Sequence, residues 1–411
     1  MTSRAHACRI CQSPDHDLVL DYGEVVPADA FLSSIDAAAH EQRYPLTLVL
    51  CQRCFHLQIL EVLDPALLFV NYVWETGIPA SIQRYCREFA DAVLARSGGP
   101  ASPSVFEIAS NDGTMLKEFR SRGCRLLGVD PARNIARKAN SAGIPTIPDF
   151  FGERVARDVL TEHGQWDVVI ARNVLAHVAD VHGLIAGLRL LLTPQGTAVI
   201  EVPHLLDLYR ELQYDQVFHE HIGYHSLDSI IRLCAMHDLV VFDVEHPWVH
   251  GGSVRAYVGH AAADRRALPT VAGMLAEEET AGILGRQAWQ QFGDRARTQK
   301  RLLRAELSSL REAGKMVVGY GAAAKGMSMI QFCELDDQLV AYVADKSTMK
   351  IGKFAPGAHI PIVSPDRMRA DPVDVVVVFA WNFAREILAQ EKAMRDRGVR
   401  FLHPIPEPHY L

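Results

Sequence analysis

Long hydrophobic runs are absent from this sequence. No stretch approaches the roughly 18 consecutive apolar residues of a membrane-spanning helix. The first residues, MTSRAHACRICQ, lack the apolar core of a signal peptide. An excess of basic residues is missing as well, because the formal net charge is −7, and this balance argues against broad nucleic-acid binding. We therefore expect a cytoplasmic protein with neither a membrane nor a nucleic acid as its partner.

Flexible linkers are also missing, and disulfides are not expected. No glycine- or serine-rich stretch divides the 411 residues. The eight cysteines would stay reduced in the cytoplasm. A chain of this length, with 49% apolar and 22% charged residues, indicates a globular protein of two or three domains. Without linkers, those domains should pack against one another.

Four of the cysteines form two C-x-x-C pairs, CRIC at Cys8 and Cys11 and CQRC at Cys51 and Cys54. Each short turn holds two thiolates about as far apart as two ligands of a tetrahedral zinc ion. A redox centre needs only one such pair, so the second pair favours a metal. Four thiolates leave no coordination position open, and the predicted zinc is therefore structural.

From residue 104 the sequence alternates between short apolar strands and helices. This alternation predicts an α/β fold with a parallel sheet covered by helices on both faces. Ligands of such folds bind beyond the carboxyl ends of the strands. The expected strands are 104–109, 124–130, 166–171 and 196–202, and the expected helices are 114–123, 131–143 and 181–196.

The loop after the first expected strand reads EIASNDG and lacks the G-x-G-x-x-G of a dinucleotide-binding loop. Asp130 ends the second strand, where an acidic side chain hydrogen-bonds the ribose hydroxyls of a nucleoside cofactor. The turn at residues 111–113 would bring backbone groups close to that cofactor. These positions alone do not separate NAD from S-adenosylmethionine (SAM).

The stretch QVFHEHIGYHS, residues 216–226, contains three histidines, a glutamate and a tyrosine. Its H-E-H spacing differs from the H-E-x-x-H of zinc proteases, although a metal cage and a polar loop stay open as alternatives. Imidazole has a pKa near the operating pH, which makes it the usual base for proton removal. We favour an acid–base centre in which neighbouring donors stabilise the anion that forms.

The last third of the sequence repeats the order of strand, glycine loop and helix, which predicts a second, smaller α/β unit. Residues 263–314 read as helices, and one more helix is expected over 384–398. In KMVVGYGAAAKGMSMI, small residues and Lys325 are placed where a helix N-terminus can approach phosphate. Upstream, HGGSVRAYV predicts close backbone approach or positive φ at its glycines, then a strand at one edge of the first sheet. Arg255 on that strand either holds a phosphate or faces solvent.

Several motifs occur here in one order: FEIASNDGTMLKEF, LGVDPARNIA, ARNVLAHVADV, EVPHLLDL, FHEHIGYHSL and HGGSVR. With the paired C-x-x-C knuckles and the C-terminal GYGAAAKG, PGAHIPI and WNFAREI, the chain resembles the SAM-dependent C-methyltransferases of nucleotide-linked deoxysugars. That resemblance implies a zinc-binding domain (1–66), a Rossmann-like SAM methyltransferase core (67–262), a helical connector (263–313) and a Rossmann-like nucleotide-binding domain (314–411). The implied reaction methylates a carbon alpha to the ketone of a dTDP-type keto-deoxysugar through a base-generated enolate.

The resemblance also implies the residues of the site. His221 would be the base, with Glu220 and His177 as its orienting or electrostatic partners; Tyr224 is our own further catalytic candidate. The implied contacts to SAM are Glu107, Ala109, Asn111, Asp112, Gly113, Asp130, Pro131 and Asn173. The implied contacts to the nucleotide diphosphate sugar are Tyr72, Trp74, His204, His219, Arg255, Gly321 and Lys325.

At two positions the sequence departs from that family. Phe218 stands where the family has a tyrosine before H-E-H, so Tyr224 or a histidine would have to supply the missing donor. Trp74 falls in a region that the family fills with tyrosines. These departures keep open a methyltransferase of the same fold with a non-sugar or atypical acceptor. Two further alternatives are a pyridine-nucleotide dehydrogenase and a non-catalytic binding protein stabilised by zinc. A monomer is compatible with the sequence.

Overall fold

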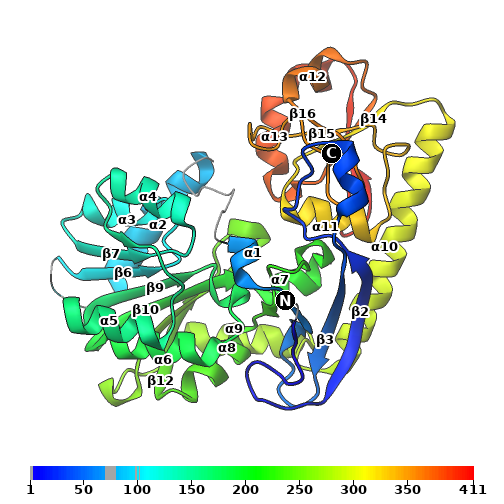
Figure 1. The fold of residues 1–411 in the computed structure, drawn as a ribbon. Helices are drawn as coiled ribbons and strands as arrows, with labels where there is room; N and C mark the ends of the chain where they lie inside the picture. The colour runs from blue at the N-terminus through cyan, green and yellow to red at the C-terminus, as the bar shows by residue number, and fades with distance from the viewer. Residues whose placement is uncertain (1–2, 70–79, 98–99, 101) are drawn as a thin grey trace.

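The protein consists of an N-terminal sheet, a large central α/β unit and a smaller C-terminal α/β unit (Figure 1). The computed structural model describes residues 3–69, 80–97, 100 and 102–411. Tyr72 and Trp74, predicted substrate contacts, lie outside this described part. The long helix α10 (Arg286–Glu312) runs along one side of the molecule, beside the N-terminal sheet and the C-terminal unit.

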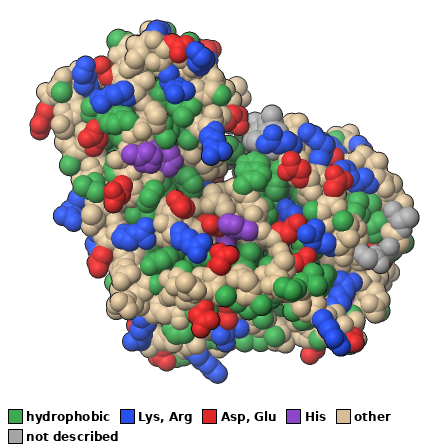
Figure 2. All heavy atoms as spheres, turned by 180° about the vertical axis from the view of Figure 1, so that it is seen from behind, with side chains coloured by type: hydrophobic (Ala, Val, Ile, Leu, Met, Phe, Trp, Pro, Cys, Tyr) green, Lys and Arg blue, Asp and Glu red, His purple; other side chains and the backbone are tan. Residues whose placement is uncertain are grey.

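Acidic and basic side chains are interspersed on the face seen from behind (Figure 2). On that face the surface is notched between the C-terminal unit and the central unit. Within the described ranges, no helix has both the length and the apolar character needed to cross a bilayer.

The N-terminal sheet has four antiparallel strands in the order β11-β4-β3-β2. Its outer strand β11 (Gly223–Tyr224) comes from the histidine-rich stretch, far along the chain, and pairs with β4. The N-terminal domain is therefore completed by a piece of the expected active site. The other elements are β1 (Ser3–Arg4), β2 (His16–Val25), β3 (Tyr44–Cys51), β4 (Leu57–Ile59), β5 (Glu61–Val62) and α1 (Pro65–Phe69).

The central sheet has seven strands in the order β12-β13-β10-β9-β6-β7-β8. The chain passes from β6 to β7 and β8 on one side, then crosses to β9 and β10 on the other, so the strand order reverses between β6 and β9. β13 is antiparallel, as predicted, but the predicted edge position is wrong because β12 lies outside it. The strands are β6 (Ser104–Ile108), β7 (Arg125–Val129), β8 (Thr146–Ile147), β9 (Trp166–Arg172), β10 (Leu192–Pro203), β12 (Leu239–Glu245) and β13 (Ser253–His260).

Helices pack on both faces of the central sheet, which confirms the predicted α/β class. One predicted helix is too long: α6 ends at Leu191, and β10 begins at Leu192 rather than near residue 196. Pro194 explains the early end, since its ring and missing N–H do not allow a helix to continue. The helices are α2 (Ala80–Ser97), α3 (Thr114–Arg120), α4 (Arg133–Ser141), α5 (Glu153–His163), α6 (Val181–Leu191), α7 (Leu205–Arg210) and α8 (Leu227–Ala235).

The C-terminal sheet has six strands in the order β16-β15-β14-β17-β18-β19, with only the β18–β19 pair antiparallel. Its first five strands repeat the central arrangement, because the chain again turns back across its first strand, here β14. The second α/β unit is thus as predicted. The strands are β14 (Val317–Tyr320), β15 (Val343–Ala344), β16 (Ile362–Val363), β17 (Val375–Val378), β18 (Arg400–His403) and β19 (His409–Tyr410).

Helices α9 (Pro269–Thr280) and α10 occupy the region predicted to be helical between the two units. The single helix predicted over 384–398 is wrong, since α13 (Ala384–Gln390) and α14 (Lys392–Asp396) are separated at Glu391. The Glu391 carboxylate is buried and accepts two hydrogen bonds from Arg369, at 2.8 and 2.6 Å. Drawing this residue into the core breaks the helix there. The remaining helices are α11 (Ala324–Phe332) and α12 (Pro365–Ala370).

One apolar core joins the N-terminal sheet, α10, α11 and residues 214–224, which we call the histidine segment. The Tyr22 hydroxyl on β2 donates to the Tyr214 carbonyl oxygen at 2.7 Å. Ser328 on α11 donates to the Val217 carbonyl oxygen at 2.6 Å. The histidine segment is therefore held from two sides by units that are distant in the sequence.

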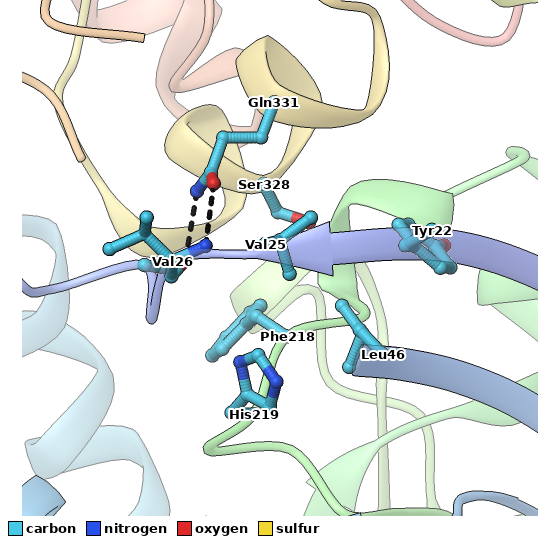
Figure 3. Close-up of a pocket in the computed structure, with 9 residues that line it drawn as sticks. Tyr22, Val25, Val26, Leu46, Phe218, His219, Ser328 and Gln331 are labelled. Carbon is cyan, nitrogen blue, oxygen red and sulfur yellow. Dashed lines mark hydrogen bonds between the residues drawn. The ribbon is translucent and has the colours of Figure 1, made fainter. Parts of the chain in front are cut away.

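The N- and C-terminal units also contact each other directly beside the histidine segment (Figure 3). Gln331 on α11 accepts a hydrogen bond from the Val26 amide at 2.9 Å and donates one to the Val26 carbonyl at 3.0 Å. Phe218 and His219 lie on the other side of the small cavity that these residues line. Its volume is about 10 Å³, room for roughly one water molecule and far too little for a substrate.

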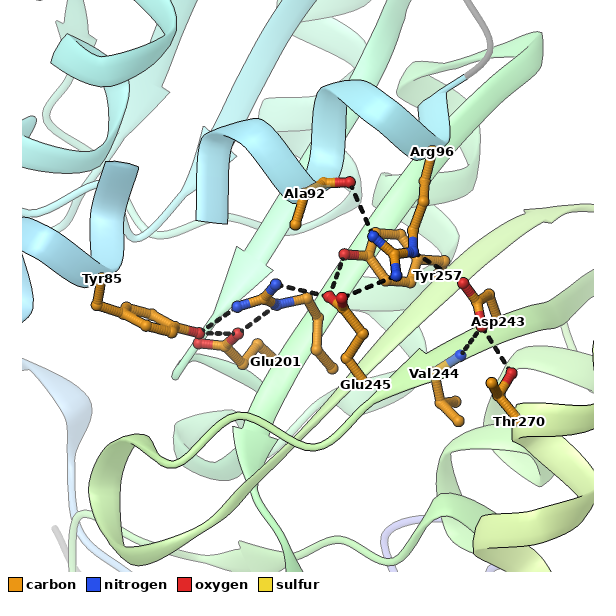
Figure 4. A network of polar contacts seen from close by, with 10 residues as sticks. Tyr85, Ala92, Arg96, Glu201, Asp243, Val244, Glu245, Tyr257 and Thr270 are labelled. Carbon is orange, nitrogen blue, oxygen red and sulfur yellow. Dashed lines mark hydrogen bonds and ion pairs between the residues drawn. The ribbon is translucent and has the colours of Figure 1, made fainter. Parts of the chain in front are cut away.

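Arg255, predicted as a possible phosphate ligand, is buried against carboxylates instead. Figure 4 labels its partners Glu201, Glu245 and Tyr85. The Arg255 Nε lies 2.7 Å from Glu201 and its Nη1 2.7 Å from Glu245, and Nη2 donates to the Tyr85 hydroxyl. Arg96 extends the network to Asp243 at 2.8 Å. Neither the phosphate role nor a solvent-facing position fits this placement, because the guanidinium is needed to neutralise buried acids.

We expect Arg255→Met to lower the free energy of unfolding by about 3–5 kcal/mol, the usual cost of leaving a buried charge without its partner. Glu201, whose side chain is 0% exposed, would be the stranded charge. Denaturant unfolding followed by circular dichroism measures the change. Arg154→Ala is the control, since Arg154 pairs only with exposed acids and its loss should leave the midpoint within error. Equal effects of the two substitutions would contradict the buried network.

Candidate active site

The four predicted zinc ligands come together at the base of the N-terminal sheet. The Sγ atoms of Cys8 and Cys54 lie 3.5 Å apart, as do those of Cys11 and Cys51, and all four lie within 4.8 Å of one another. Zn–S bonds of about 2.3 Å in a tetrahedron place sulfur atoms at separations of this size. The donor set therefore fits zinc, as predicted, with no ligand position left for a substrate.

Arg9 connects this zinc knuckle to the histidine segment. Its side chain is 6% exposed, and its Nη1 donates to the carbonyl oxygens of Ile59 at 2.7 Å and Ile222 at 3.0 Å. Ile222 directly follows His221. The residue next to the predicted base is thus bonded to a residue that lies between two zinc ligands.

Removal of zinc is expected to loosen the histidine segment before the rest of the protein. Cys54→Ser should raise hydrogen–deuterium exchange of backbone amides in residues 214–226, because Arg9 and β11 lose their support. Amides of β17 should keep their protection. Mass spectrometry of peptic fragments measures both, with Cys124→Ser as the control because its thiol lies outside the cluster. Unchanged protection at 214–226 would show that the zinc knuckle does not hold the site.

A strained loop follows β6 at the point where the central strand order reverses. Ala109, Asn111 and Gly113 have φ values of 55°, 50° and 75°. A Cβ at Gly113 would lie 2.9 Å from the Ile144 side chain, so glycine is required there. Left-handed non-glycine residues cost about 1–3 kcal/mol each and concentrate at ligand sites.

Asp130 holds this loop in place. Its two carboxylate oxygens accept hydrogen bonds from the amides of Asn111 and Ala132, both at 2.8 Å. Each oxygen keeps a second lone pair, so the carboxylate can still accept from two ribose hydroxyls. Pro131 and Asp112 are the chain neighbours of these residues. Several of the predicted SAM contacts therefore lie side by side here. The geometry fits a nucleoside at this edge of the sheet.

Buried polar atoms without hydrogen-bond partners gather at the same edge. They include Glu107 Oε2, Arg172 Nε and Asn173 Oδ1. Burial raises the pKa of Glu107 to about 8, opposed by Arg172. Unpaired polar atoms are rare in protein interiors. Their concentration at the carboxyl ends of β6 and β9 fits groups that a polar cofactor would satisfy.

The predicted base, His221, has its tautomer fixed by the backbone. Its Nδ1 lies 3.0 Å from the Gln216 carbonyl oxygen. Because a carbonyl only accepts, Nδ1 carries the proton and Nε2 keeps its lone pair. Burial and then the charge of His177 lower the pKa of His221 well below its ordinary value, so the ring is neutral at pH 7.

His177 and His221 are neighbours, with ring centroids 4.8 Å apart. His177 Nδ1 lies 2.6 Å from the Glu220 carbonyl oxygen, and burial lowers its pKa to about 4. Glu220 thus supports His177 through its backbone, while burial and then Asp29 raise the pKa of its side chain to about 8. The Glu220 carboxyl is accordingly neutral at pH 7.

Phe218 and Tyr224 occupy different places around His221. The Phe218 ring lies 4.1 Å from the His221 ring, so an apolar face stands where the family tyrosine is expected. The Tyr224 hydroxyl donates to the His221 carbonyl oxygen at 2.8 Å. Its single proton is therefore committed to shaping the segment. The Nδ1 protons of His177 and His221 are committed to carbonyl oxygens as well, so none of these three side chains supplies the missing donor.

The C-terminal unit contributes a cation to this site. Lys325 Nζ is buried without a hydrogen bond to any described residue and lies 4.5 Å from the centroid of the Trp381 ring. Trp381 Nε1 donates to Asp215 at 2.6 Å. Burial lowers the pKa of Lys325 to about 8, opposed by Asp215. Burial and then the charge of Lys325 lower the pKa of His250 to about 3.

His250 is a site residue that the sequence reasoning did not single out. Its Nε2 lies 2.9 Å from Asn173 Nδ2, which donates the hydrogen bond. The two glycines after it have φ values of 91° and 104°, and a Cβ at Gly251 would lie 2.5 Å from the Trp381 ring. The predicted close approach and positive φ are both found. The HGG motif was the available signal for His250, and WNFAREI contains Trp381, while no local signal points to Asp215.

Other predicted substrate contacts lie elsewhere. His219 Nε2 lies 3.1 Å from the Pro45 carbonyl oxygen, on the side of the N-terminal sheet. His204 is 2% exposed and bonded to Glu278, so its placement does not support the predicted substrate contact. Gly321 follows β14 with a φ of 94° and marks the loop where the strand order of the C-terminal sheet reverses.

That C-terminal loop is built like the cofactor loop. Asp345, which follows β15, accepts hydrogen bonds from the amides of Ala322 at 2.7 Å and Ser347 at 2.8 Å. Asp130 makes the corresponding pair of contacts in the central unit. Two loops of the same design, each fixed by an aspartate, are thus present in one chain.

Three family profiles match this chain in sequence. A zinc binding domain covers residues 8–69, a "Methyltransferase domain" covers 81–244, and a "C-methyltransferase C-terminal domain" covers 248–406. The curated protein "C-methyltransferase NovU" of Streptomyces niveus is 38% identical over 404 residues, which are 98% of this chain and 96% of that protein. The chain belongs to the C-methyltransferase family.

Solved methyltransferase structures are similar over part of the chain. Magnesium protoporphyrin IX methyltransferase (ChlM) from Synechocystis PCC 6803 with bound SAM has 12% identity and a TM-score of 0.34, over 43% of this chain and 79% of that one. The glycopeptide N-methyltransferase MtfA with sinefungin has 14% identity and a TM-score of 0.35, over 46% and 96%. This C-methyltransferase uses SAM as the methyl donor and holds structural zinc, which sets aside the dehydrogenase and the non-catalytic alternatives.

Proposed function

We propose that this C-methyltransferase methylates a carbon alpha to the ketone of a nucleotide-linked, dTDP-type keto-deoxysugar through an enolate. The observation that carries the proposal is the fixed tautomer of His221, whose Nε2 keeps its lone pair beside other neutral histidines. A base of this kind is needed because an unactivated C–H does not attack a methyl donor. SAM supplies the methyl group on a positively charged sulfur and leaves as SAH.

His221 Nε2 takes the proton from the alpha carbon, and the C–H electron pair moves toward the ketone oxygen. That carbon then forms the new bond to the methyl group as the sulfur–carbon bond breaks. His221 is held for this step by the Gln216 carbonyl and, through the backbone, by Tyr224 and Arg9. Holding the two reacting groups in line supplies much of the rate enhancement.

Lys325 is our candidate for the group that stabilises the enolate oxygen. Its ammonium is charged below pH 8, buried, and without a hydrogen-bond partner in the described part of the chain. A donor aimed at developing negative charge in a dry site is worth a factor of about 10²–10³ in rate. Phe218 cannot donate, and the Tyr224 proton is committed, so Lys325 replaces the family phenol.

In this proposal the nucleotide of the substrate binds at the loop that follows β14. Gly321 allows close approach, since a Cβ there would lie 2.4 Å from that of Ala380. Asp345 fixes the loop as Asp130 does in the cofactor unit. Lys350 donates to the Ala322 carbonyl at 2.8 Å and adds positive charge beside it. Lys325 then lies between this loop and the histidines.

Proton abstraction can be measured separately from methyl transfer, as exchange of the alpha hydrogen with D₂O in the presence of SAH. We expect His221→Asn to slow this exchange by about 10²–10⁴, the usual contribution of a general base. The pKa of His221 is lowered, so its active neutral form persists as pH falls. The acid limb of kcat/KM should therefore lie below pH 6.5. Loss of Lys325 charge should give an alkaline limb near pH 8.

Lys325→Gln should remove that alkaline limb and slow both exchange and transfer, whereas Lys315→Gln, on the surface, should change neither. If His221→Asn exchanges the alpha hydrogen with D₂O as fast as wild type does, His221 is not the base. An alkaline limb that persists in Lys325→Gln would assign that titration to another group.

The acceptor class is tested with a dTDP-linked 4-keto-deoxysugar, the same sugar without its nucleotide, and a small ketone. We expect kcat/KM to fall at least about 100-fold without the nucleotide, because the contacts to the C-terminal loop are lost. Calorimetry should show dTDP binding in the presence of SAH. Equal activity on the small ketone would favour the second candidate, an atypical acceptor, which the apolar Phe218 face beside His221 makes worth testing.

A further inference from the structure

A second cluster of metal-ligating side chains lies behind the loop that carries His250. His204 precedes α7, Asp207 is in the first turn of that helix, and His246 follows β12. One ligand atom from each lies within 4.8 Å of the others. His246 Nε2 is 2.6 Å from Asp207 Oδ2, and His204 Nδ1 is 3.5 Å from the same oxygen.

His204 is aimed into this cluster with an unused nitrogen. Its side chain is 2% exposed, and Nδ1 makes no hydrogen bond with any described residue. The other nitrogen, Nε2, donates to Glu278 Oε1 at 2.8 Å. That donation places a ring proton on Nε2, and Nδ1 faces Asp207 and His246.

Glu278 acts as the orienting carboxylate that metal-binding histidines usually have. It is fully buried, and the amides of Leu227 at 2.6 Å and Asp228 at 3.1 Å donate to it from the start of α8. The carboxylate cannot rotate away without breaking these bonds. His204 is therefore pre-oriented from behind.

Asp207 is fixed from the opposite side. A Cβ at residue 252 would lie 2.2 Å from Asp207 Oδ2, so Gly252 is what admits the carboxylate. His246, in contrast, is half exposed, with 50% of its side chain accessible. His204 is thus buried, Asp207 is half-buried, and His246 can close over an ion that arrives from solvent.

We propose that His204 Nδ1, Asp207 Oδ2 and His246 Nε2 form a second metal site that binds a divalent first-row transition ion such as Zn²⁺. Two imidazoles and one carboxylate are a common set for such ions, with bonds of about 2.0–2.2 Å. The site is separate from the four cysteines and leaves coordination positions to water. It braces the His250 loop, because the His204 amide donates to the Gly252 carbonyl at 3.1 Å.

The test is metal stoichiometry of the full chain, by equilibrium dialysis against micromolar Zn²⁺ and elemental analysis. Wild type should bind two equivalents, and Co²⁺ in the second site should lack the thiolate charge-transfer absorption of the cysteine site. His246→Ala and Asp207→Asn should bind one equivalent, with the second Kd raised at least tenfold. Since His246 is half exposed, His246→Ala should fold normally, which its thermal midpoint checks.

His359→Ala is the matched control. His359 Nε2 contacts Glu41 at 2.6 Å, the same imidazole–carboxylate distance, but no second histidine joins it in the clusters of the described chain. This variant should keep both equivalents. One equivalent in wild type, or a second equivalent that survives in His246→Ala, would overturn the proposal and leave Asp207 as a hydrogen-bonded partner of two histidines.

Discussion

The site depends on one constraint: the backbone of the histidine segment is held by buried contacts from elements that are distant in the sequence. Tyr22 holds it from the N-terminal sheet, Ser328 from the C-terminal unit, and Arg9 from the zinc knuckle. Each contact ends on a carbonyl oxygen of the segment rather than on a catalytic side chain. The histidine rings are thereby left available for chemistry while their backbone is fixed. Positioning within fractions of an ångström is what such a reaction requires.

The two α/β units contribute matching edges to that arrangement. In each sheet the chain turns back across its first strand, and an aspartate after the second strand bonds the amides of the loop. Polar atoms without partners occur after β9, at Asn173, and after β17, at Asn382. The loop after the first strand is therefore fixed in the same way in both units. Under the proposed function, the histidine segment and Lys325 lie between the two ligands.

Short-range patterns in the sequence predicted the parts that local chemistry determines. Paired cysteines, the βα alternation and Asp130 at a strand end each depend on neighbouring residues, and the structure has them where the pattern placed them. Arg255 could not be assigned in this way, because its partner Glu201 lies on another strand and local sequence does not reveal a buried ion pair. Lys325 was predicted near phosphate, whereas its contact with Trp381 and Asp215 depends on how whole units pack. The break at Glu391 has the same origin, since a partner distant in sequence overrides helix propensity.

The strand β11 has a consequence for how the protein is made. A ribosome releases the first three strands of the N-terminal sheet long before residues 223 and 224 emerge. Until then β4 has an unpaired edge, and unpaired edges of nascent sheets are sites of misassembly. The zinc knuckle can bind its ion early, because all four cysteines precede residue 55. The bound metal would thus stabilise the incomplete sheet until residues 223 and 224 of the histidine segment pair with β4.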